Sequence, residues 1–470
     1  MAHLYVAAAH KSSGKTTVSV GLTAALTKRG LAVQPFKKGP DYIDPLWLAR
    51  AAGRPCYNLD FFTQTRKEIV TTFATNLGGS DIGLIEGNKG LFDGVDVEGT
   101  DSNAALATML AAPVVLVIDT SGMTRGIAPL IRGYLDFDPD VYIGGVILNK
   151  VGGARHEAKL RAALERYTDA EVLGAIGRDA ALEIPERHLG LIPANEASGP
   201  AAADIMISRL ADSISTGVDL KRIMEIAKAT SLPAGMKGAF SPSQTSGRKS
   251  DVRIAIARDA AFGFYYPDDL DAFEQAGAEL IPFDTLNDAQ LPEADGLFIG
   301  GGFPETHLEA LSANQSMLTD IRGALATGMP AYAECGGLMY LSRSIQWRGE
   351  QRDMVGTVPA DVSVEKRPQG RGYMVVEDSG KHPWPQLFNT DKLKPDGIPV
   401  HEFHYARLEN LDEDQAFAHR VLRGTGIDGN HDGLVINNLL AGFAHHRNTA
   451  ANPWVKRFVA FVREKSAKYQ

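Results

Sequence analysis

Short apolar runs alternate with helical patterns through the first half of the chain. Each run is rich in Val, Ile and Leu and is followed by polar turn residues and a segment with helical spacing. The runs cover Leu4 to Ala8, Leu31 to Phe36, Ile82 to Glu86, Val114 to Asp119, Tyr142 to Leu148 and Glu171 to Ile176. This alternation is typical of a parallel sheet covered by helices on both faces. We therefore predict an α/β domain.

The alternation restarts after a polar segment, Ser231 to Asp251, which is rich in Ser, Gly, Pro and Lys and has no apolar periodicity. Such a composition is typical of a linker. The later apolar runs cover Val252 to Ala257, Glu279 to Phe283, Gly296 to Gly300 and Pro330 to Ala333. The pattern thus predicts two α/β domains, over residues 1–232 and 251–470, joined by a linker over residues 233–250.

Composition and charge narrow the choice of partners. A chain of 470 residues with 44% hydrophobic and 22% charged residues is long enough for two domains and typical of a globular protein. The formal net charge of −9 argues against a nucleic-acid partner, which normally requires a basic surface. We instead expect small-molecule partners; a homodimer is compatible with the sequence.

Two features of the sequence indicate the cellular location of the protein: its longest apolar stretch and its cysteine count. Met109 to Ile118 is too short to cross a membrane and reads as a buried strand, so no membrane partner is expected. The N-terminus lacks the order of regions found in a signal peptide. Cys56 and Cys335 are the chain's cysteines, which excludes a disulfide framework and favours a reducing compartment. We expect a cytoplasmic protein.

The first candidate site is a phosphate-binding loop in the segment AHKSSGKTT, residues 9–17. A strand precedes it and a helical pattern, Val18 to Arg29, follows it, which is the context that a phosphate-binding loop requires. Lys15 would neutralise phosphate charge and Thr16 would ligate Mg²⁺. Ser13, Gly14 and Thr17 complete the predicted loop. Ala9 replaces the usual first glycine, and an ordinary tight turn with a solvated Lys15 is the alternative interpretation.

Carboxylates near the ends of predicted strands are candidate magnesium ligands. Asp41 and Glu86 lie where open α/β sheets bind ligands, and Asp93 follows in KGLFDG. For Asp44, a surface position and a site position are equally favoured.

Asn149 and Lys150 follow another strand and could contact the nucleotide base, although the pair is also common in turns. Asp119 has the placement of a secondary carboxylate.

The second candidate site is Cys335 in MPAYAECGGLMYL, residues 329–341. The cysteine follows a predicted strand and precedes Gly336 and a helical stretch, so it is expected to project as a nucleophile suited to acyl transfer. A second glycine cluster, which includes Gly301 and Gly302, could supply oxyanion donors together with the N–H of Gly336. A lone buried cysteine is the alternative.

The base for this cysteine must be a histidine brought close by folding. Two clusters qualify, His401 with His404, and His445 with His446. His445 follows a predicted strand, Leu439 to Phe443, and is our choice, with His446 as the neighbouring alternative.

With these residues assembled, the chain resembles the cobyrinic acid a,c-diamide synthase family of glutamine-dependent tetrapyrrole amidases. The resemblance rests on the Gly-Lys-Thr-Thr loop, FKKGPDYIDP, EGNKGLFDG, GGGFPE, AECGGLMYL, RGY at 371–373, HEFHY at 401–405 and the final histidine. It implies a P-loop NTPase-like domain similar to dethiobiotin synthetase, and a class I glutamine amidotransferase-like domain.

The resemblance also implies roles for individual residues. ATP and Mg²⁺ would be bound at Lys15, Thr16, Asp41 and Glu86, Asp93 would lie near the reacting carboxylate, and Cys335 and His445 would be the glutaminase pair. Substrate contacts would come from Tyr42, Lys89, Arg371, Tyr373, His401 and His404. Many class I domains carry a Glu two residues after the histidine, whereas this chain has Arg447. The third member of the triad is therefore missing or supplied differently.

Members of this family amidate cobyrinate, hydrogenobyrinate, nickel sirohydrochlorin or sirohaem. The expected reaction is conversion of cobyrinate to its a,c-diamide through an acyl phosphate, with a sirohaem or nickel-sirohydrochlorin amidase as the alternative. Two other classes compete with an amidase. A P-loop ATPase switch would use the same loop without needing Cys335, and a regulatory protein could keep the amidotransferase fold for binding alone.

Overall fold

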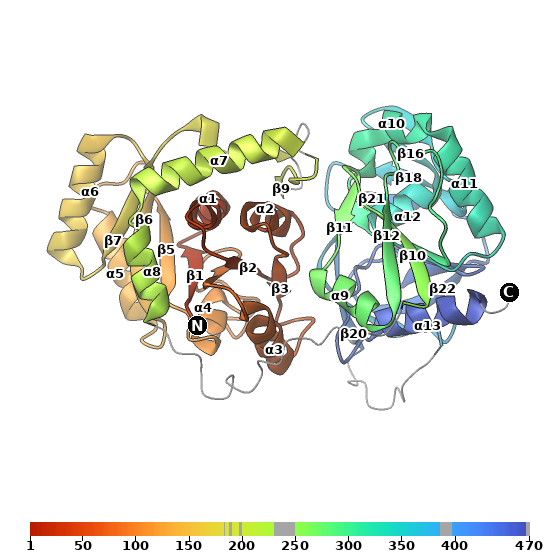
Figure 1. Ribbon diagram of the computed structural model, residues 1–470, viewed down its shortest axis with the longest axis horizontal. Coiled ribbons are helices and arrows are strands. Elements are labelled where there is room, and N and C mark those ends of the chain that lie inside the picture. Colours follow the sequence, from red (N-terminus) through yellow and green to blue (C-terminus); the bar gives the residue numbers. More distant parts are fainter. Residues whose placement is uncertain (183, 188–189, 197–199, 230–249, 386–396, 467–470) are drawn as a thin grey trace. The chain divides into compact units, whose positions relative to one another are not determined.

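A computed structural model describes residues 1–182, 184–187, 190–196, 200–229, 250–385 and 397–466 (Figure 1). The chain divides into two compact units, Met1–Gln244 and Thr245–Gln470. The expected linker, residues 233–250, lies outside the described residues except for Ser250, so those boundaries stay a prediction. Within the described residues, no helix is long and apolar enough to cross a membrane.

The first unit is built on a parallel sheet. Its described strands run in the order β3-β2-β4-β1-β5-β6-β7, and every neighbouring pair is parallel. The strands are β1 (His3–Ala8), β2 (Val33–Lys38), β3 (Tyr57–Leu59), β4 (Ile82–Glu86), β5 (Val114–Asp119), β6 (Ile143–Val151) and β7 (Val172–Gly177). The predicted parallel sheet is confirmed.

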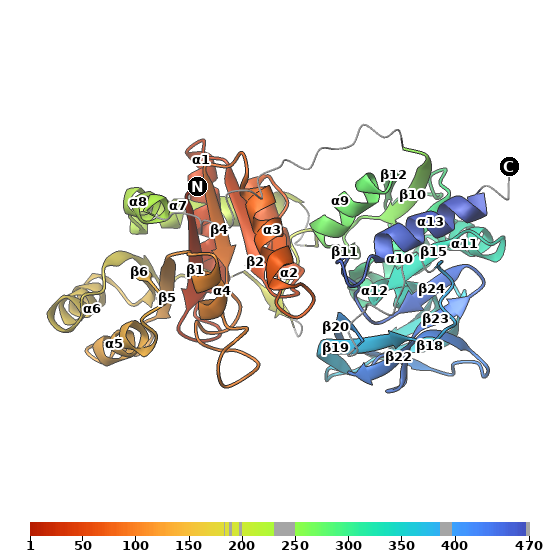
Figure 2. The same ribbon diagram turned by 90° about the horizontal axis from the view of Figure 1, so that it is seen from below.

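Helices cover both faces of this sheet (Figure 2). Alternate residues of β1 face opposite ways, so that Leu4 and Val6 join one core while Tyr5 and Ala7 join the other. The first core is closed by α1 (Lys15–Lys28), α2 (Ile43–Ala52), α7 (Pro200–Gly217) and α8 (Leu220–Lys228); the second by α3 (Arg66–Leu77), α4 (Asn103–Met109), α5 (Ile127–Phe137) and α6 (Ala154–Tyr167). A short antiparallel pair, β8 (Glu186–Arg187) and β9 (Gly190–Leu191), precedes α7.

Two boundaries differ from the sequence prediction in ways that matter for function. Helix α1 begins at Lys15 rather than Val18, so the predicted phosphate loop passes directly into the first helical turn. Strand β2 ends at Lys38 rather than Phe36, which places Lys37 and Lys38 inside the sheet, where both are buried. Apolar content alone could not predict this extension, because a strand that carries two lysines has no hydrophobic signal at its end.

The second unit contains a mixed sheet. Its described strands run in the order β12-β10-β13-β15-β24-β23-β22-β19-β20, parallel as far as β24 and antiparallel beyond it. The parallel strands are β10 (Val252–Ala257), β12 (Ala278–Phe283), β13 (Gly296–Ile299), β15 (Ala331–Glu334) and β24 (Leu439–Gly442). The antiparallel strands are β19 (Gly370–Asp378), β20 (Ile398–His404), β22 (Ala416–Arg423) and β23 (His431–Ile436).

Helices and two smaller sheets complete this unit. One core packs β10 against α9 (Pro267–Gln275) and α13 (Trp454–Ser466), and the other contains α10 (Leu308–Ala313), α11 (Gln315–Ala326) and α12 (Gly336–Leu341). The smaller sheets are β11 (Phe262–Phe264) with β14 (Gly301–Gly302), and β16 (Ser342–Trp347), β17 (Glu350–Asp353), β18 (Val358–Val364) and β21 (Ala406–Glu409). The predicted α/β class is confirmed for this unit.

Candidate active sites

The predicted phosphate loop connects β1 to α1. Gly14 has a φ of 81°, a conformation that favours glycine, and a Cβ there would lie 2.1 Å from Asn149 Nδ2. Ala9, by contrast, has no positive φ, so an alanine fits where the usual motif has glycine. Alanine in place of the usual glycine at position 9 therefore causes no backbone strain.

Asn149 and Lys150 hold the phosphate loop in place. The Asn149 amide donates to the Ser13 carbonyl at 2.9 Å and is buried, while Lys150 Nζ donates to the Ser12 carbonyl at 3.2 Å. Lys150 also pairs with Asp119 at 2.9 Å. The expected contact of Asn149 and Lys150 with a nucleotide base stays a prediction; their contacts in the protein support the loop itself.

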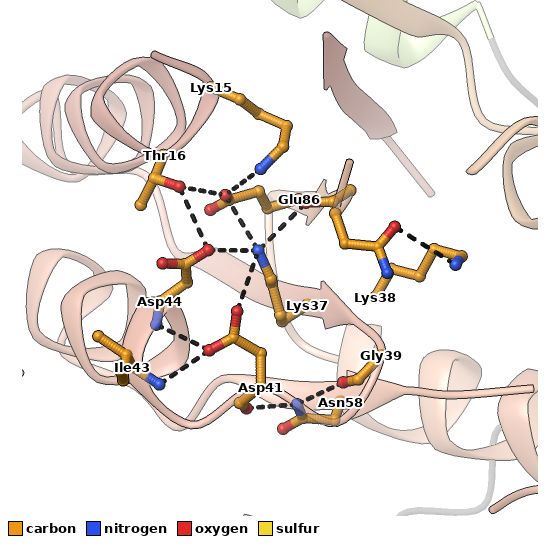
Figure 3. Close-up of polar contacts among 12 residues, drawn as sticks. Lys15, Thr16, Lys37, Lys38, Gly39, Asp41, Ile43, Asp44, Asn58 and Glu86 are labelled. Carbon is orange, nitrogen blue, oxygen red and sulfur yellow. Dashed lines mark hydrogen bonds and ion pairs between the residues drawn. The ribbon is translucent and has the colours of Figure 1, made fainter. Parts of the chain in front are cut away.

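Glu86 is the centre of a charged cluster at the end of β4 (Figure 3). Its Oε1 accepts hydrogen bonds from Lys15 Nζ at 2.7 Å and from Thr16 Oγ1 at 2.7 Å. The Glu86 side chain is fully buried, yet its Oε2 has no hydrogen-bond partner in the described structure. A buried carboxylate oxygen without a partner is costly, which makes it a candidate ligand for a cation or water.

Lys37 is a residue of this cluster that the sequence did not single out. It is 1% exposed, and its Nζ contacts Asp44, Glu86 Oε1 at 3.2 Å and the Gly87 carbonyl at 3.1 Å (Figure 3). Burial opposes its charge, but the carboxylates of Asp44 and Glu86 outweigh that effect and raise the pKa of Lys37 well above its usual value. The cluster therefore contains a second fixed ammonium group beside Lys15.

The two aspartates of GPDYIDP have different surroundings. Asp41 Oδ1 accepts from the backbone N–H of Ile43 at 2.9 Å, at the start of α2, and its other oxygen lies 3.5 Å from Lys37 Nζ. Asp44 instead accepts from Thr16 Oγ1 at 3.2 Å. Burial and Asp44 raise the pKa of Asp41; for Asp44, burial is outweighed by Lys37 and Lys15, which lower its pKa. The sequence left the role of Asp44 undecided, and the structure shows that its carboxylate contacts the Thr16 hydroxyl directly.

These residues fit a nucleotide with Mg²⁺. Thr16, Glu86 and Asp44 supply the oxygen atoms that Mg²⁺ prefers, and the partnerless Glu86 oxygen lies among them. No cluster of three His, Cys, Asp or Glu side chains arranged for a metal is present in the described residues. An ion held by a hydroxyl and one or two carboxylates, with phosphate oxygens completing the set, would not require such a cluster.

The loop after β4 carries the candidate substrate residues of this unit. Leu91 N donates to the Ala8 carbonyl at 2.9 Å, so the loop lies against the start of the phosphate loop. Asp93 and Lys89 are exposed on it, and Asp93 Oδ2 accepts from Gly90 N at 2.9 Å. Tyr42, the residue before α2, is buried. The expected contacts of these residues with substrate stay predictions.

Cys335 lies at the turn between β15 and α12, as the sequence predicted for the surrounding elements. Its φ of 47° and ψ of −102° are strained for a residue with a side chain, and its N–H donates to the Gly442 carbonyl at 2.7 Å. A strained turn between a strand and a helix is the geometry that projects a nucleophile from a sheet. Cys335 is 7% exposed, which leaves limited access to solvent.

The two glycine clusters meet beside Cys335. A Cβ on Gly336 would lie 2.9 Å from Gly302 N, and a Cβ on Gly301 would lie 2.5 Å from His445 Cε1. Side chains at these positions would therefore collide with the neighbouring loop. This close approach would let backbone N–H groups reach a substrate oxygen at Cys335. The oxyanion roles of Gly301, Gly302 and Gly336 stay predictions.

Substituting Gly302 by alanine is expected to lower the stability of the second unit. The added Cβ would lie 1.9 Å from the Ala261 carbonyl oxygen, so the β11–β14 pair must move. Gly323 is the matched control: it is exposed inside α11 with open space around it, so Gly323→Ala should stabilise the protein by about 0.5–1 kcal/mol. Thermal unfolding of both variants is the measurement; an unchanged unfolding temperature in Gly302→Ala would contradict the close packing.

His445 is brought to Cys335 by long-range contacts. Asp432 accepts from Phe443 N at 3.0 Å and Ala444 N at 3.1 Å, and the His445 backbone pairs with that of His401. Burial opposes protonation of His445, but its hydrogen bond to Cys335 and its contact with Glu334 raise its pKa to about 10. An imidazolium beside a cysteine favours thiolate, the nucleophilic form.

The other histidines of the two clusters take different positions. His446 Nδ1 lies 3.1 Å from Asn452 Nδ2, and its ring packs near Tyr332. Burial and the charge of His445 lower the pKa of His401 to about 3. His404 is buried, with its ring stacked on Phe443 at a centroid distance of 3.9 Å.

Three candidate substrate residues share one face of the β19–β20 pair. Tyr373 lies opposite His401 in the register, and Arg371 lies opposite Phe403, with its guanidinium 5.9 Å from that ring. His404 points to the other face because side chains alternate along a strand. The placement groups Arg371, Tyr373 and His401, and it gives no support to a substrate contact by His404, which stays a prediction.

Together these features define a class. One unit carries a phosphate loop facing a carboxylate cluster, and the other carries a strained cysteine turn with a histidine, which is the combination of a nucleotide-binding domain and a glutamine amidotransferase. Residues 5–192 match the family profile "CobQ/CobB/MinD/ParA nucleotide binding domain", and residues 253–453 match "CobB/CobQ-like glutamine amidotransferase domain".

Curated relatives narrow the class to a family. The chain is 45% identical over 467 residues to a cobyrinate a,c-diamide synthase of Magnetococcus marinus, covering 99% of this chain and 98% of that protein. It is 42% identical to a protein of the same name from Methanosarcina acetivorans, covering 95% and 92%, and 40% identical to that of Methanosarcina barkeri, covering 98% and 96%. The chain belongs to the cobyrinate a,c-diamide synthase family.

Proposed function

We propose that this protein uses ATP and glutamine to convert the a and c acetate side chains of cobyrinate into carboxamides. The observation that carries the proposal is the match to cobyrinate a,c-diamide synthases along nearly the whole of both chains. Both chemical sites fall inside the matched residues. A switch ATPase would have no use for the second site, and the amidotransferase domain argues against that alternative.

The first unit would activate the carboxylate. A carboxylate does not condense with ammonia unaided, so it must first become an acyl phosphate. Lys15 and Lys37 are two ammonium groups fixed around Glu86, and they would offset negative charge on transferred phosphoryl oxygens. Mg²⁺ held by Thr16 with Glu86 and Asp44, or with Asp41, would supply further charge compensation. Asp93 and Lys89, on the adjacent loop, would face the reacting carboxylate.

The second unit would release ammonia from glutamine. Cys335 Sγ attacks the carboxamide carbon, the C–N bond breaks, and His445 delivers a proton to the leaving nitrogen. Water then hydrolyses the thioester to glutamate with His445 accepting a proton. The backbone around Gly302 and Gly336 would stabilise the oxyanion. The cytoplasmic location and the homodimer stay predictions.

The test is to identify the amidated product directly. The purified protein is incubated with ATP, Mg²⁺ and glutamine, and with cobyrinate, sirohydrochlorin, nickel sirohydrochlorin or sirohaem as the acceptor. Each amide changes the product mass by the difference between OH and NH₂, so mass spectrometry counts the amides formed. We expect two amides on cobyrinate. Preferred amidation of sirohaem or nickel sirohydrochlorin would replace cobyrinate as the substrate, and no amidation of any acceptor would contradict the proposal.

A further inference from the structure

We propose that Glu334, the residue immediately before Cys335, is the positioning carboxylate of the glutaminase site and completes a Cys335–His445–Glu334 triad. The inference rests on the proposed glutaminase function. The sequence left the third member of the catalytic triad unassigned, because the residue two positions after His445 is Arg447 and not a glutamate. Glu334 would fill that role. Nothing in the chain's sequence marks Glu334, since its role depends on a histidine 111 positions away.

Glu334 is fixed by contacts at both oxygens. Its Oε2 lies 3.2 Å from His445 Nδ1, while its Oε1 accepts from Tyr332 Oη at 2.6 Å and from the backbone N–H of His446 at 2.9 Å. The side chain is 4% exposed. A buried carboxylate held by two other donors presents its remaining oxygen to the imidazole in one orientation.

The strand that carries Glu334 is itself anchored. Tyr332 lies two residues earlier on β15, on the same face of the strand, and its ring packs against Phe298 and Trp454 at centroid distances of 5.4 and 4.9 Å. Burial raises the pKa of Tyr332 well above its usual value, so its hydroxyl remains a donor. The carboxylate is therefore oriented by a rigid aromatic core and not by a flexible loop.

Arg447 cannot take the place of the usual carboxylate. It is 1% exposed, bonds Asp268 Oδ2 at 2.8 and 3.1 Å, and lies over the Tyr266 ring at 4.9 Å. This guanidinium has the wrong charge to stabilise an imidazolium. Among the described residues, the carboxylate that contacts the His445 ring is that of Glu334.

The arrangement assigns a separate task to each imidazole nitrogen. With Nδ1–H directed at Glu334, Nε2 is left to exchange a proton with Cys335 Sγ and the leaving nitrogen. Glu334 stabilises the imidazolium without taking its proton, as in a serine protease triad. Glu334 acts through His445 and contacts no reacting atom, so it is a positioning residue.

Kinetics of Glu334→Gln provide the first test. Glutamine has nearly the same shape, so the variant removes the charge while it can still accept from Tyr332 and His446. We expect kcat for glutamine hydrolysis to fall about 10²- to 10⁴-fold with little change in KM, and amidation driven by ammonium salts to stay at the wild-type rate. Glu402→Gln is the matched control, because Glu402 is also buried but accepts from Thr425 N and Gly426 N instead; it should keep glutaminase activity.

Thiol alkylation tests whether Glu334 acts through His445. The titratable groups around the imidazole are Cys335 and Glu334, His401 at a ring distance of 6.2 Å, and His446 next in the chain. Iodoacetamide alkylates the thiolate, and the rate is followed against pH, with Cys335→Ala as the blank for Cys56. In Glu334→Gln the pH dependence of alkylation should shift, because the imidazolium beside the thiol loses its counter-charge.

Making Glu334→Gln in a His445→Ala background completes a double-mutant cycle. If Glu334 acts through His445, Glu334→Gln adds no further shift once the imidazole is gone. An equal shift in both backgrounds, or wild-type kinetics and alkylation in a folded Glu334→Gln variant, would overturn the triad. These readouts need no tetrapyrrole. A wild-type protein that hydrolyses no glutamine would instead refute the proposed function, so the two failures are distinguishable.

Discussion

Replacing Cys335 by alanine is expected to abolish amidation with glutamine as the nitrogen donor and to leave amidation with ammonium salts intact. The cysteine forms the thioester from which ammonia is released, and free ammonia makes that step unnecessary. Its strained turn, hydrogen bond to His445 and adjacent glycines all lie in the second unit, whereas the charged cluster of Lys15, Lys37 and Glu86 lies in the first. Activation of the carboxylate should therefore continue.

Amide formation with each nitrogen donor is measured at saturating ATP, together with glutamate release. Cys56→Ala is the control, because Cys56 is also buried but belongs to the core of the first unit. We expect that variant to retain both reactions. A folded Cys335→Ala protein that also failed with ammonium salts would contradict the division of labour between the two units.

Lys15→Ala is expected to lower amidation with glutamine and with ammonium salts alike, by at least about 10³-fold, because both require the activated carboxylate. Lys15 occupies the first turn of α1, and its Nζ lies 2.7 Å from Glu86 Oε1, where it can move to a phosphate oxygen without a change in the backbone. Basal glutamine hydrolysis in the second unit should remain.

Lys28→Ala is the matched control for this prediction. Lys28 ends the same helix and forms an exposed ion pair with Asp212, which is worth about 0–1 kcal/mol, so both amidation reactions should be retained. Stabilisation by ATP and Mg²⁺ in thermal unfolding gives an independent readout, expected for the control and absent for Lys15→Ala. Normal ammonium-driven amidation by Lys15→Ala would refute the assignment of the loop.

The charged cluster shows where sequence reasoning reached its limit. The position of Glu86 was predictable, because it ends an apolar strand that is followed at once by glycine. Lys37 was not, since a lysine is rarely buried, and here three neighbouring carboxylates stabilise its charge. The choice between Asp41 and Asp44 depended on where each side chain points: Asp44, in the first turn of α2, contacts the Thr16 hydroxyl, whereas Asp41, which precedes the helix, accepts from the backbone N–H of Ile43.

The second unit shows the same limit. The parallel strands followed from their apolar runs, whereas the antiparallel strands β19, β20, β22 and β23 carry few continuous apolar residues and were not predicted. Those strands matter because the bridge between His401 and His445 helps place the imidazole beside Cys335.

The sequence by itself determined the α/β class of both units, the phosphate loop, the cysteine turn and the family. These follow from local patterns, in which neighbouring residues in the chain act together. Only the tertiary structure decided that Asp44 joins Glu86 at the Thr16 hydroxyl, that the expected His445 lies beside Cys335, and that Glu334 contacts that histidine. The physical reason is that these contacts join residues far apart in the chain, so they exist only after the strands have paired and their side chains have been directed to one face.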